Sequence, residues 1–150
     1  MSNDFILLAD DNTRSADLFV KVLRMRDIGT GVVLARDGAE TLDYLFGEGE
    51  HAGRDTSVMP RLVILDLNMP GMDGLEVLTR LRADERTALL PIIIFSASGT
   101  TRDMAQAYRM GANAYVDKVS STTFPEAVWH MVYFWLNVNQ PPPVLEHLPS

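Results

Sequence analysis

The chain has 150 residues, a length typical of one domain, and 47% of them are apolar, which is enough for one core. A formal net charge of −7 argues against direct binding of nucleic acid, and the absence of cysteine excludes disulfides and thiol chemistry. The N-terminal residues lack the basic region of a signal peptide, and no apolar run is long enough to span a bilayer. We therefore expect a cytoplasmic protein with no membrane or nucleic-acid partner.

Short apolar runs alternate with segments of helical periodicity along the chain. The expected strands are 5–9, 32–35, 62–65, 92–95 and 114–116. The first helix should begin at a cap provided by Asn12 or Thr13, the second should carry an inner stripe over 39–46, and the others should cover about 74–84, 101–110 and 123–138. Gly111 should follow the fourth helix as its C′ glycine. Five such βα units predict an α/β fold with a doubly wound, five-stranded parallel sheet in the flavodoxin-like order 2-1-3-4-5.

The domain organisation follows from the end of the last helix. Three consecutive prolines, 141–143, cannot continue a helix, so residues 141–150 should form a proline-rich C-terminal tail. Residues 1–140 should form one domain, in which neither an internal repeat nor a second core is visible. The polar loop 47–59, before the third strand, is unusually long for a compact α/β domain.

Polar side chains follow four of the expected strands. Asp10 and Asp11 follow the first strand, Asp66 the third, Ser96 the fourth and Lys118 the fifth. Carboxyl ends of parallel strands meet at one edge of a sheet, and the order 2-1-3-4-5 puts the first and third strands side by side. Three carboxylates that close repel each other unless a cation binds among them. A hydroxyl and an ammonium group beside them suit a phosphoryl group.

This pattern resembles the receiver domain of two-component response regulators. The resemblance extends over about residues 4–138, and the matching segments are Asp10-Asp11, 66–74, Ser96-Ala97 and 115–118. It implies that Asp66 accepts a phosphoryl group from a sensor histidine kinase. It also implies Mg²⁺ as the cofactor, held by Asp10, Asp11, Asp66 and the backbone carbonyl of Asn68.

The resemblance also implies roles for three further residues. Lys118 and Ser96 would contact phosphoryl oxygens, and Ser96 would move toward the phosphoryl group when the protein is activated. The ring of Tyr115 would then turn inward and change the face formed by the fourth helix, the fifth strand and the fifth helix. The alternative is a half-exposed Tyr115 that does not move. One residue departs from the family: Val119 follows Lys118 where proline is usual, so the backbone there must be rerouted or strained.

Because no second core follows the domain, the signal must pass through a partner, a homodimer or onward phosphotransfer. Aromatic residues off the core stripe of the last helix, Trp129, Tyr133 and Phe134, suggest a homodimer interface on the face of the fourth and fifth helices. A nearer resemblance is to the stand-alone regulators that pair with bacterial phytochrome histidine kinases. Three features carry it: the long loop that ends at Pro60-Arg61, the segment 133–136 and the proline-containing extension. It implies a bacteriophytochrome as the candidate kinase.

Three other functions stay open. A phosphatase with an aspartyl nucleophile would carry an Asp-x-Asp motif near the first strand, whereas the candidate nucleophile here follows the third. A flavin-binding module would need Ser, Thr or Gly after the first strand, where Asp10 and Asp11 would repel the flavin phosphate. An unphosphorylated receiver-like module that only binds other proteins is the third, and the intact set of acids argues against it.

Overall fold

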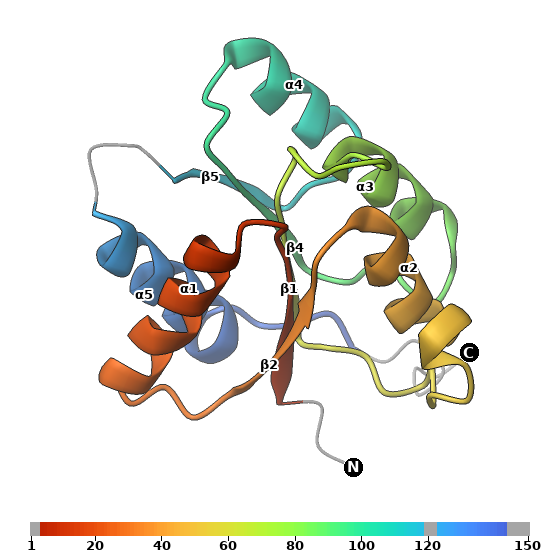
Figure 1. The fold of residues 1–150 in the computed structure, drawn as a ribbon, viewed down its shortest axis with the longest axis horizontal. Helices are drawn as coiled ribbons and strands as arrows, with labels where there is room; N and C mark the ends of the chain where they lie inside the picture. The colour runs from red at the N-terminus through yellow and green to blue at the C-terminus, as the bar shows by residue number, and fades with distance from the viewer. Residues whose placement is uncertain (1–3, 119–122, 144–150) are drawn as a thin grey trace.

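The structure is a computed structural model of the chain, and it describes residues 4–118 and 123–143. These residues form a five-stranded parallel sheet with helices on both faces (Figure 1). The strands are β1 (Phe5–Ala9), β2 (Gly31–Ala35), β3 (Leu62–Leu65), β4 (Ile92–Ser96) and β5 (Ala114–Asp117). The helices are α1 (Thr13–Met25), α2 (Gly38–Phe46), α3 (Gly74–Ala83), α4 (Thr101–Arg109) and α5 (Phe124–Tyr133), with a 3₁₀ turn η1 (Gly49–His51) and a π-helical segment η2 (Phe134–Val138). The order β2-β1-β3-β4-β5 and the five helices confirm the predicted fold.

The central strands are apolar throughout because both of their faces are covered. Every residue of β3 is buried, as parallel strands between two layers of helices require. Alternate residues face opposite sides: Leu7 and Val63 pack with α2 and α3, whereas Ile6 and Ile64 pack with α1 and α5. Full burial of each such side chain stabilises the fold by about 1.5–3 kcal/mol. The sheet is thereby fixed between two cores. The edge formed by the carboxyl ends of its strands is not covered in this way and can bear polar side chains.

Side-chain caps set where the described α-helices begin. Asn12, one of the two predicted candidates, caps α1, because its Oδ1 accepts from the backbone N–H of Ser15 at 3.0 Å. The other caps are Asp37 for α2, Asp73 for α3, Thr100 for α4 and Thr123 for α5. Each such cap contributes about 0.5–2 kcal/mol. Gly111 follows α4 with φ at 106°, a left-handed conformation that confirms it as the predicted C′ glycine.

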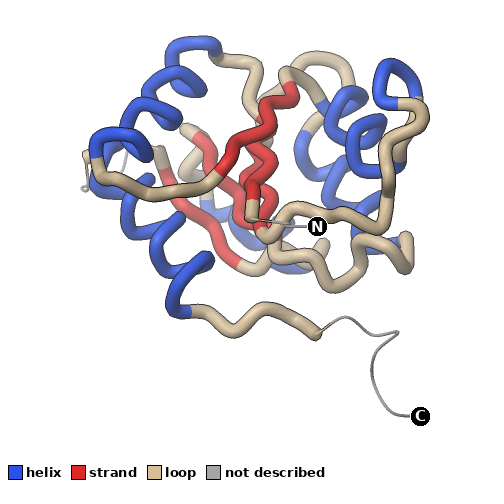
Figure 2. The backbone as a smooth tube through the Cα atoms, turned by 90° about the horizontal axis from the view of Figure 1, so that it is seen from below, coloured by secondary structure: helices blue, strands red, loops and turns tan. Residues whose placement is uncertain are grey.

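The C-terminal part of the predicted fifth helix is not α-helical. The α-helix ends at Tyr133, and η2 continues it with the wider π-helical turn, in which the N–H of Asn139 reaches the carbonyl of Phe134 at 2.7 Å. After η2 the chain leaves the helix as an irregular segment up to residue 143 (Figure 2), as the prolines predict. The remainder of the expected tail, 144–150, lies outside the described residues. No helix in the described part of the chain is long and apolar enough to cross a bilayer.

The long loop 47–59 is fastened to the end of α2 by Arg54. Its guanidinium donates to the carbonyl of Leu45 at 3.2 Å and to that of Val58 at 2.7 Å. It also lies over the ring of Tyr44, 4.3 Å from the centroid. A cation at the carboxyl end of a helix is favourable, because the helix dipole is negative there. The loop is therefore anchored at the edge of the sheet opposite to the predicted site.

Candidate metal and phosphoryl site

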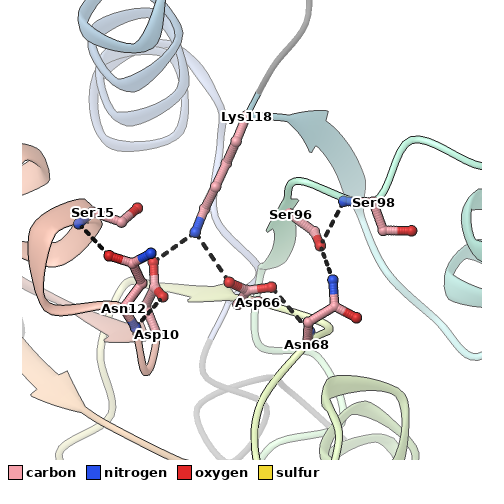
Figure 3. A network of polar contacts seen from close by, with 8 residues as sticks. All are labelled: Asp10, Asn12, Ser15, Asp66, Asn68, Ser96, Ser98 and Lys118. Carbon is pink, nitrogen blue, oxygen red and sulfur yellow. Dashed lines mark hydrogen bonds and ion pairs between the residues drawn. The ribbon is translucent and has the colours of Figure 1, made fainter.

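The register of the sheet brings the predicted site residues to one edge. Ala9 pairs with Leu65, so the next residues of the two strands, Asp10 and Asp66, lie side by side. Lys118 follows the last residue of β5, and its side chain reaches across β4 toward both acids (Figure 3). The site is thus assembled at the carboxyl ends of the strands, where open α/β sheets bind ligands.

Three carboxylates form the centre of the site. Oxygen atoms of Asp10, Asp11 and Asp66 all lie within 4.8 Å of one another. Asp10 is 2% exposed and Asp66 is 7% exposed, whereas Asp11 is exposed. Backbone N–H groups orient the two buried acids: Asn12 donates to Oδ1 of Asp10 at 2.9 Å, and Asn68 donates to Oδ1 of Asp66 at 3.0 Å. The Oδ2 atom of each buried acid is left to face the centre of the site.

Lys118 supplies the positive charge between the two buried acids. Its Nζ donates to Oδ2 of Asp10 at 2.7 Å and to Oδ2 of Asp66 at 3.0 Å, and the side chain is only 10% exposed. The ammonium also lies 5.4 Å from the centroid of the Phe95 ring. Val119, at which the sequence departs from the family, lies outside the described residues. Despite that departure, the ammonium of Lys118 lies at the predicted site.

Ser96 lies beside the acids and is completely buried. Its Oγ accepts from the Asn68 side-chain amide at 3.4 Å and from the backbone N–H of Ser98 at 3.3 Å. Asn68 thus contacts Asp66 with its backbone and Ser96 with its side chain (Figure 3). The role of the Asn68 carbonyl as a metal ligand stays a prediction.

Tyr115 lies on β5, half-buried, with its ring against the core formed with α2, α3 and α4. Its hydroxyl donates to the carbonyl of Ser98. Burial raises the pKa of Tyr115 above its usual value, and the charges of Asp103, Asp117 and Asp66 raise it further, while the hydrogen bond to Ser98 acts in the opposite direction. The ring is therefore connected to the β4–α4 loop in this structure, and its predicted movement stays a prediction.

The structure adds Ser98 to the residues predicted from the sequence. All of its polar groups are engaged, because its hydroxyl also donates to the carboxylate of Asp103 in the first turn of α4. Nothing in the periodicity of the sequence indicates this contact. The only signal in the sequence is the place of Ser98, two residues after Ser96.

The donor set fits Mg²⁺. This ion prefers oxygen ligands and binds through one or two carboxylates while it keeps several waters. The three acids supply those oxygens, two of them buried and one open to solvent. The chain has no cysteine, so it lacks the thiolates that favour softer metals.

Two of the three aromatic residues predicted for an interface pack against each other. Trp129 and Tyr133 stack on each other, with ring centroids 5.1 Å apart and planes inclined by 17°. The guanidinium of Arg26, just after α1, lies 5.7 Å from the Trp129 ring, so this pair is on the α1 side of α5. The two rings border an open cavity of about 530 Å³ below the α1–β2 loop. Phe134 is 45% exposed, and the interface as a whole stays a prediction.

Comparison with known proteins assigns the family. Residues 6–125 match the model of the response regulator receiver domain, so the chain belongs to this family. It is 33% identical over 138 residues to the probable methanogenesis regulatory protein FilR2 of Methanothrix harundinacea, and this match covers 91% of this chain and 86% of that protein. It is 30% identical over 113 residues to the response regulator Rcp1 of Synechocystis, and this match covers 75% of each of the two proteins.

Two solved structures share the fold over nearly the whole chain. The Mn²⁺-bound form of Rcp1 superposes with a TM-score of 0.83 at 27% identity, covering 93% of this chain and 99% of that one. The phosphorylated cyanobacterial phytochrome response regulator RcpA superposes with a TM-score of 0.85 at 31% identity, covering 95% and 100%. The predicted similarity to regulators of phytochromes is thereby confirmed. Membership of this family favours a signalling protein over the phosphatase and flavin-binding alternatives.

Proposed function

We propose that this protein is a cytoplasmic response regulator that accepts a phosphoryl group on Asp66 from a sensor histidine kinase in a Mg²⁺-dependent reaction. One observation carries the proposal: the Asp66 carboxylate is 7% exposed and is surrounded by two further acids and an ammonium group. Lys118 compensates part of the charge, but two further acids beside a buried acid cost stability through repulsion, so stability alone does not explain the arrangement. The acids that repel it suit a cation, and the ammonium suits a second anion.

The transfer would use Asp66 as the nucleophile. A carboxylate oxygen forms a bond to phosphorus as the bond from phosphorus to the imidazole nitrogen of the donor phosphohistidine breaks. The bonding electron pair leaves with the imidazole, which takes a proton from solvent, and Asp66 becomes an acyl phosphate. Lys118 then gives up one of its carboxylate contacts and pairs with a phosphoryl oxygen as a compact point charge.

The metal would be held by Asp11 and Asp66 directly, by Asp10 directly or through water, and by the carbonyl of Asn68. When bound, Mg²⁺ supplies the positive charge that offsets the repulsion between two anions, the carboxylate and the phosphoryl group. Asp11 is the exposed member of the set, so metal can reach it from solvent. The Mn²⁺-bound structure of the relative Rcp1 supports a divalent cation here.

The signal would leave through a shift between two conformations. A phosphoryl oxygen attracts the Ser96 hydroxyl, which in this structure accepts two weak hydrogen bonds, at 3.3 and 3.4 Å. Because Ser98 contacts both Ser96 and Tyr115, a change at Ser96 would reach β5 and the neighbouring helices. Phosphorylation must favour one conformation for the signal to pass.

The partners we propose are a bacterial phytochrome as the kinase and a second copy of the chain. The phytochrome is supported by the likeness to RcpA. A dimer through α4, β5 and α5 is supported by exposed apolar side chains at the C-terminal end of α4 and in η2, which continues α5, namely Tyr108, Met110, Phe134 and Val138. A stable interface should bury at least about 1,200 Å² in total.

Incubation with acetyl phosphate and Mg²⁺, followed by intact mass spectrometry, tests the proposal. The wild type should gain one phosphoryl group, and chelation of the metal should prevent the gain. Asp66→Asn should gain none, whereas the control Asp84→Asn, at the C-terminal cap of α3, should behave as the wild type. A wild type that stays unmodified with metal present would favour the unphosphorylated interaction module.

A further inference from the structure

Ser98 engages three partners on three different elements. Its N–H donates to the Oγ of Ser96 at 3.3 Å, its carbonyl accepts from the hydroxyl of Tyr115, and its own hydroxyl donates to Asp103. These partners end β4, lie on β5 and lie in the first turn of α4, respectively. Ser98, in the β4–α4 loop, therefore connects the hydroxyl of Ser96 with β5 and α4, two elements of the face through which the signal would leave.

Asp103 is well placed to hold the start of α4. It lies in the first turn of the helix, and its N–H donates to the capping Thr100 at 3.1 Å. An acid there is favoured by the positive end of the helix dipole. Because its carboxylate also accepts the hydroxyl of Ser98, the first turn of α4 is fastened to the loop that carries Ser96.

The β4–α4 loop passes close to the end of β5. A side chain on Gly99, the residue after Ser98, would place its Cβ only 2.7 Å from Oδ2 of Asp117. The loop therefore runs directly against the end of β5. A displacement of Ser98 therefore acts on its hydrogen-bonded partners Ser96, Tyr115 and Asp103.

Electrostatic repulsion is a second interaction between Asp103 and the acid site. Asp103 and Asn68 line the same cleft, about 340 Å³ in volume, beside the β3–α3 loop. Asn68 donates its N–H to Asp66, so the cleft adjoins the phosphoacceptor. A phosphoryl group adds close to two negative charges and would repel the Asp103 carboxylate across this cleft.

We propose that Ser98 is a positioning residue that links Ser96 to α4 through its hydrogen bond to Asp103, so that a phosphoryl group on Asp66 changes the first turn of α4. This inference rests on the proposed function, since it requires that group. When the hydroxyl of Ser96 turns toward a phosphoryl oxygen, the N–H of Ser98 either loses its acceptor or follows it. If it follows, the bond between Ser98 and Asp103 is strained or broken, and α4 responds.

Hydrogen exchange of the whole chain, loaded with Mg²⁺ and beryllium fluoride as the phosphoryl mimic, tests the link. Loading should change the exchange of the amides at 101–105 in the wild type and in Ser98→Thr, which keeps the hydroxyl. In Ser98→Ala and in Asp103→Ala this change should fall by about fivefold, the ratio expected for one net hydrogen bond. Ser57→Ala is the matched control, because Ser57 donates to Asp55 at 2.6 Å in a loop remote from the site.

The outcomes separate this inference from the proposed function. An undiminished response of α4 in Ser98→Ala would overturn the link, as would additive losses in the double variant Ser98→Ala/Asp103→Ala, because two ends of one bond should not add. If Ser98→Ala does not fold, Asp103→Ala removes the same bond from the other side. A wild type that binds no beryllium fluoride in the presence of Mg²⁺ would overturn the proposed function and this inference together.

Discussion

The Nζ atom of Lys118 lies 3.0 Å from Oδ2 of Asp66, inside a pocket where the lysine side chain is only 10% exposed. The same atom contacts Asp10 at 2.7 Å. Before any phosphoryl group arrives, the lysine therefore neutralises part of the charge of two buried acids. Its role in this state is to stabilise the pocket, and its role after phosphorylation would be to hold the new anion.

Lys118→Met should lower the free energy of unfolding in the absence of metal by about 3 kcal/mol, since it leaves two buried carboxylates without their cation. Mg²⁺ should restore much of this loss, because the metal takes over the neutralisation and no longer competes with an ammonium group. Urea titration with and without Mg²⁺ measures both effects. Lys21→Met, on the exposed face of α1, is the control. A loss that Mg²⁺ leaves unchanged would contradict the arrangement.

Asp11→Ala should weaken Mg²⁺ binding by at least about tenfold, because even residues that only orient metal ligands change affinity by that factor. Without metal the variant should be slightly more stable than the wild type, since one of three mutually repelling carboxylates is gone. Calorimetric titration with Mg²⁺ and thermal unfolding of the metal-free protein measure the two effects. Asp17→Ala, exposed on α1, is the control. Binding as tight as in the wild type would remove Asp11 from the ligand set.

Tyr115 should make stability fall at high pH. Burial raises its pKa in the folded state above the ordinary value of about 10. The stabilisation from this shift is fully present below the unfolded-state pKa and is lost as the pH rises through the higher folded-state pKa. Urea midpoints from about pH 8 to about pH 11 should therefore fall more steeply for the wild type than for Tyr115→Phe. Tyr108→Phe, with an exposed ring, is the control, and identical curves for wild type and Tyr115→Phe would refute the effect.

Much of this site could be predicted because it depends on the ends of strands. The run 62–65 is apolar at every position because helices cover both faces of the sheet, and Asp66 is the first residue after this strand. Asp10 follows β1 in the same way. Once strand order is known, the register alone brings the two acids together.

The remaining features depend on contacts that periodicity does not encode. The apolar residues of 123–138 recur at α-helical spacing, so the change to a π-helical turn at Phe134 was not predictable from the sequence. The contact of Ser98 with Asp103 depends on the conformation of a short loop. The placement of Trp129 beside Arg26 depends on how α5 packs against α1. Such contacts are decided by tertiary packing.

The proposed dimer should depend on the exposed apolar residues of α4 and of η2, which continues α5. The double variant Tyr108→Ser/Phe134→Ser should raise the dimer dissociation constant by at least about thirtyfold, because two anchors of about 1 kcal/mol or more are removed. Sedimentation velocity over a concentration series measures this. Leu89→Ser, in the α3–β4 loop and 49% exposed, removes an exposed apolar side chain from another surface. A wild type that sediments as a monomer at all concentrations, phosphorylated or not, would refute the dimer and leave the assignment of the family untouched.

The central claim is that Asp66 forms an acyl phosphate, and borohydride trapping tests it most directly. Borohydride reduces an acyl phosphate to an alcohol, so the modified aspartate is converted to homoserine and can be located by tandem mass spectrometry. After treatment with acetyl phosphate and Mg²⁺, homoserine should be found at position 66 alone, and chelation of the metal should abolish it. Homoserine at Asp10 or Asp11 instead, or none in protein that carries a phosphoryl group, would contradict the claim.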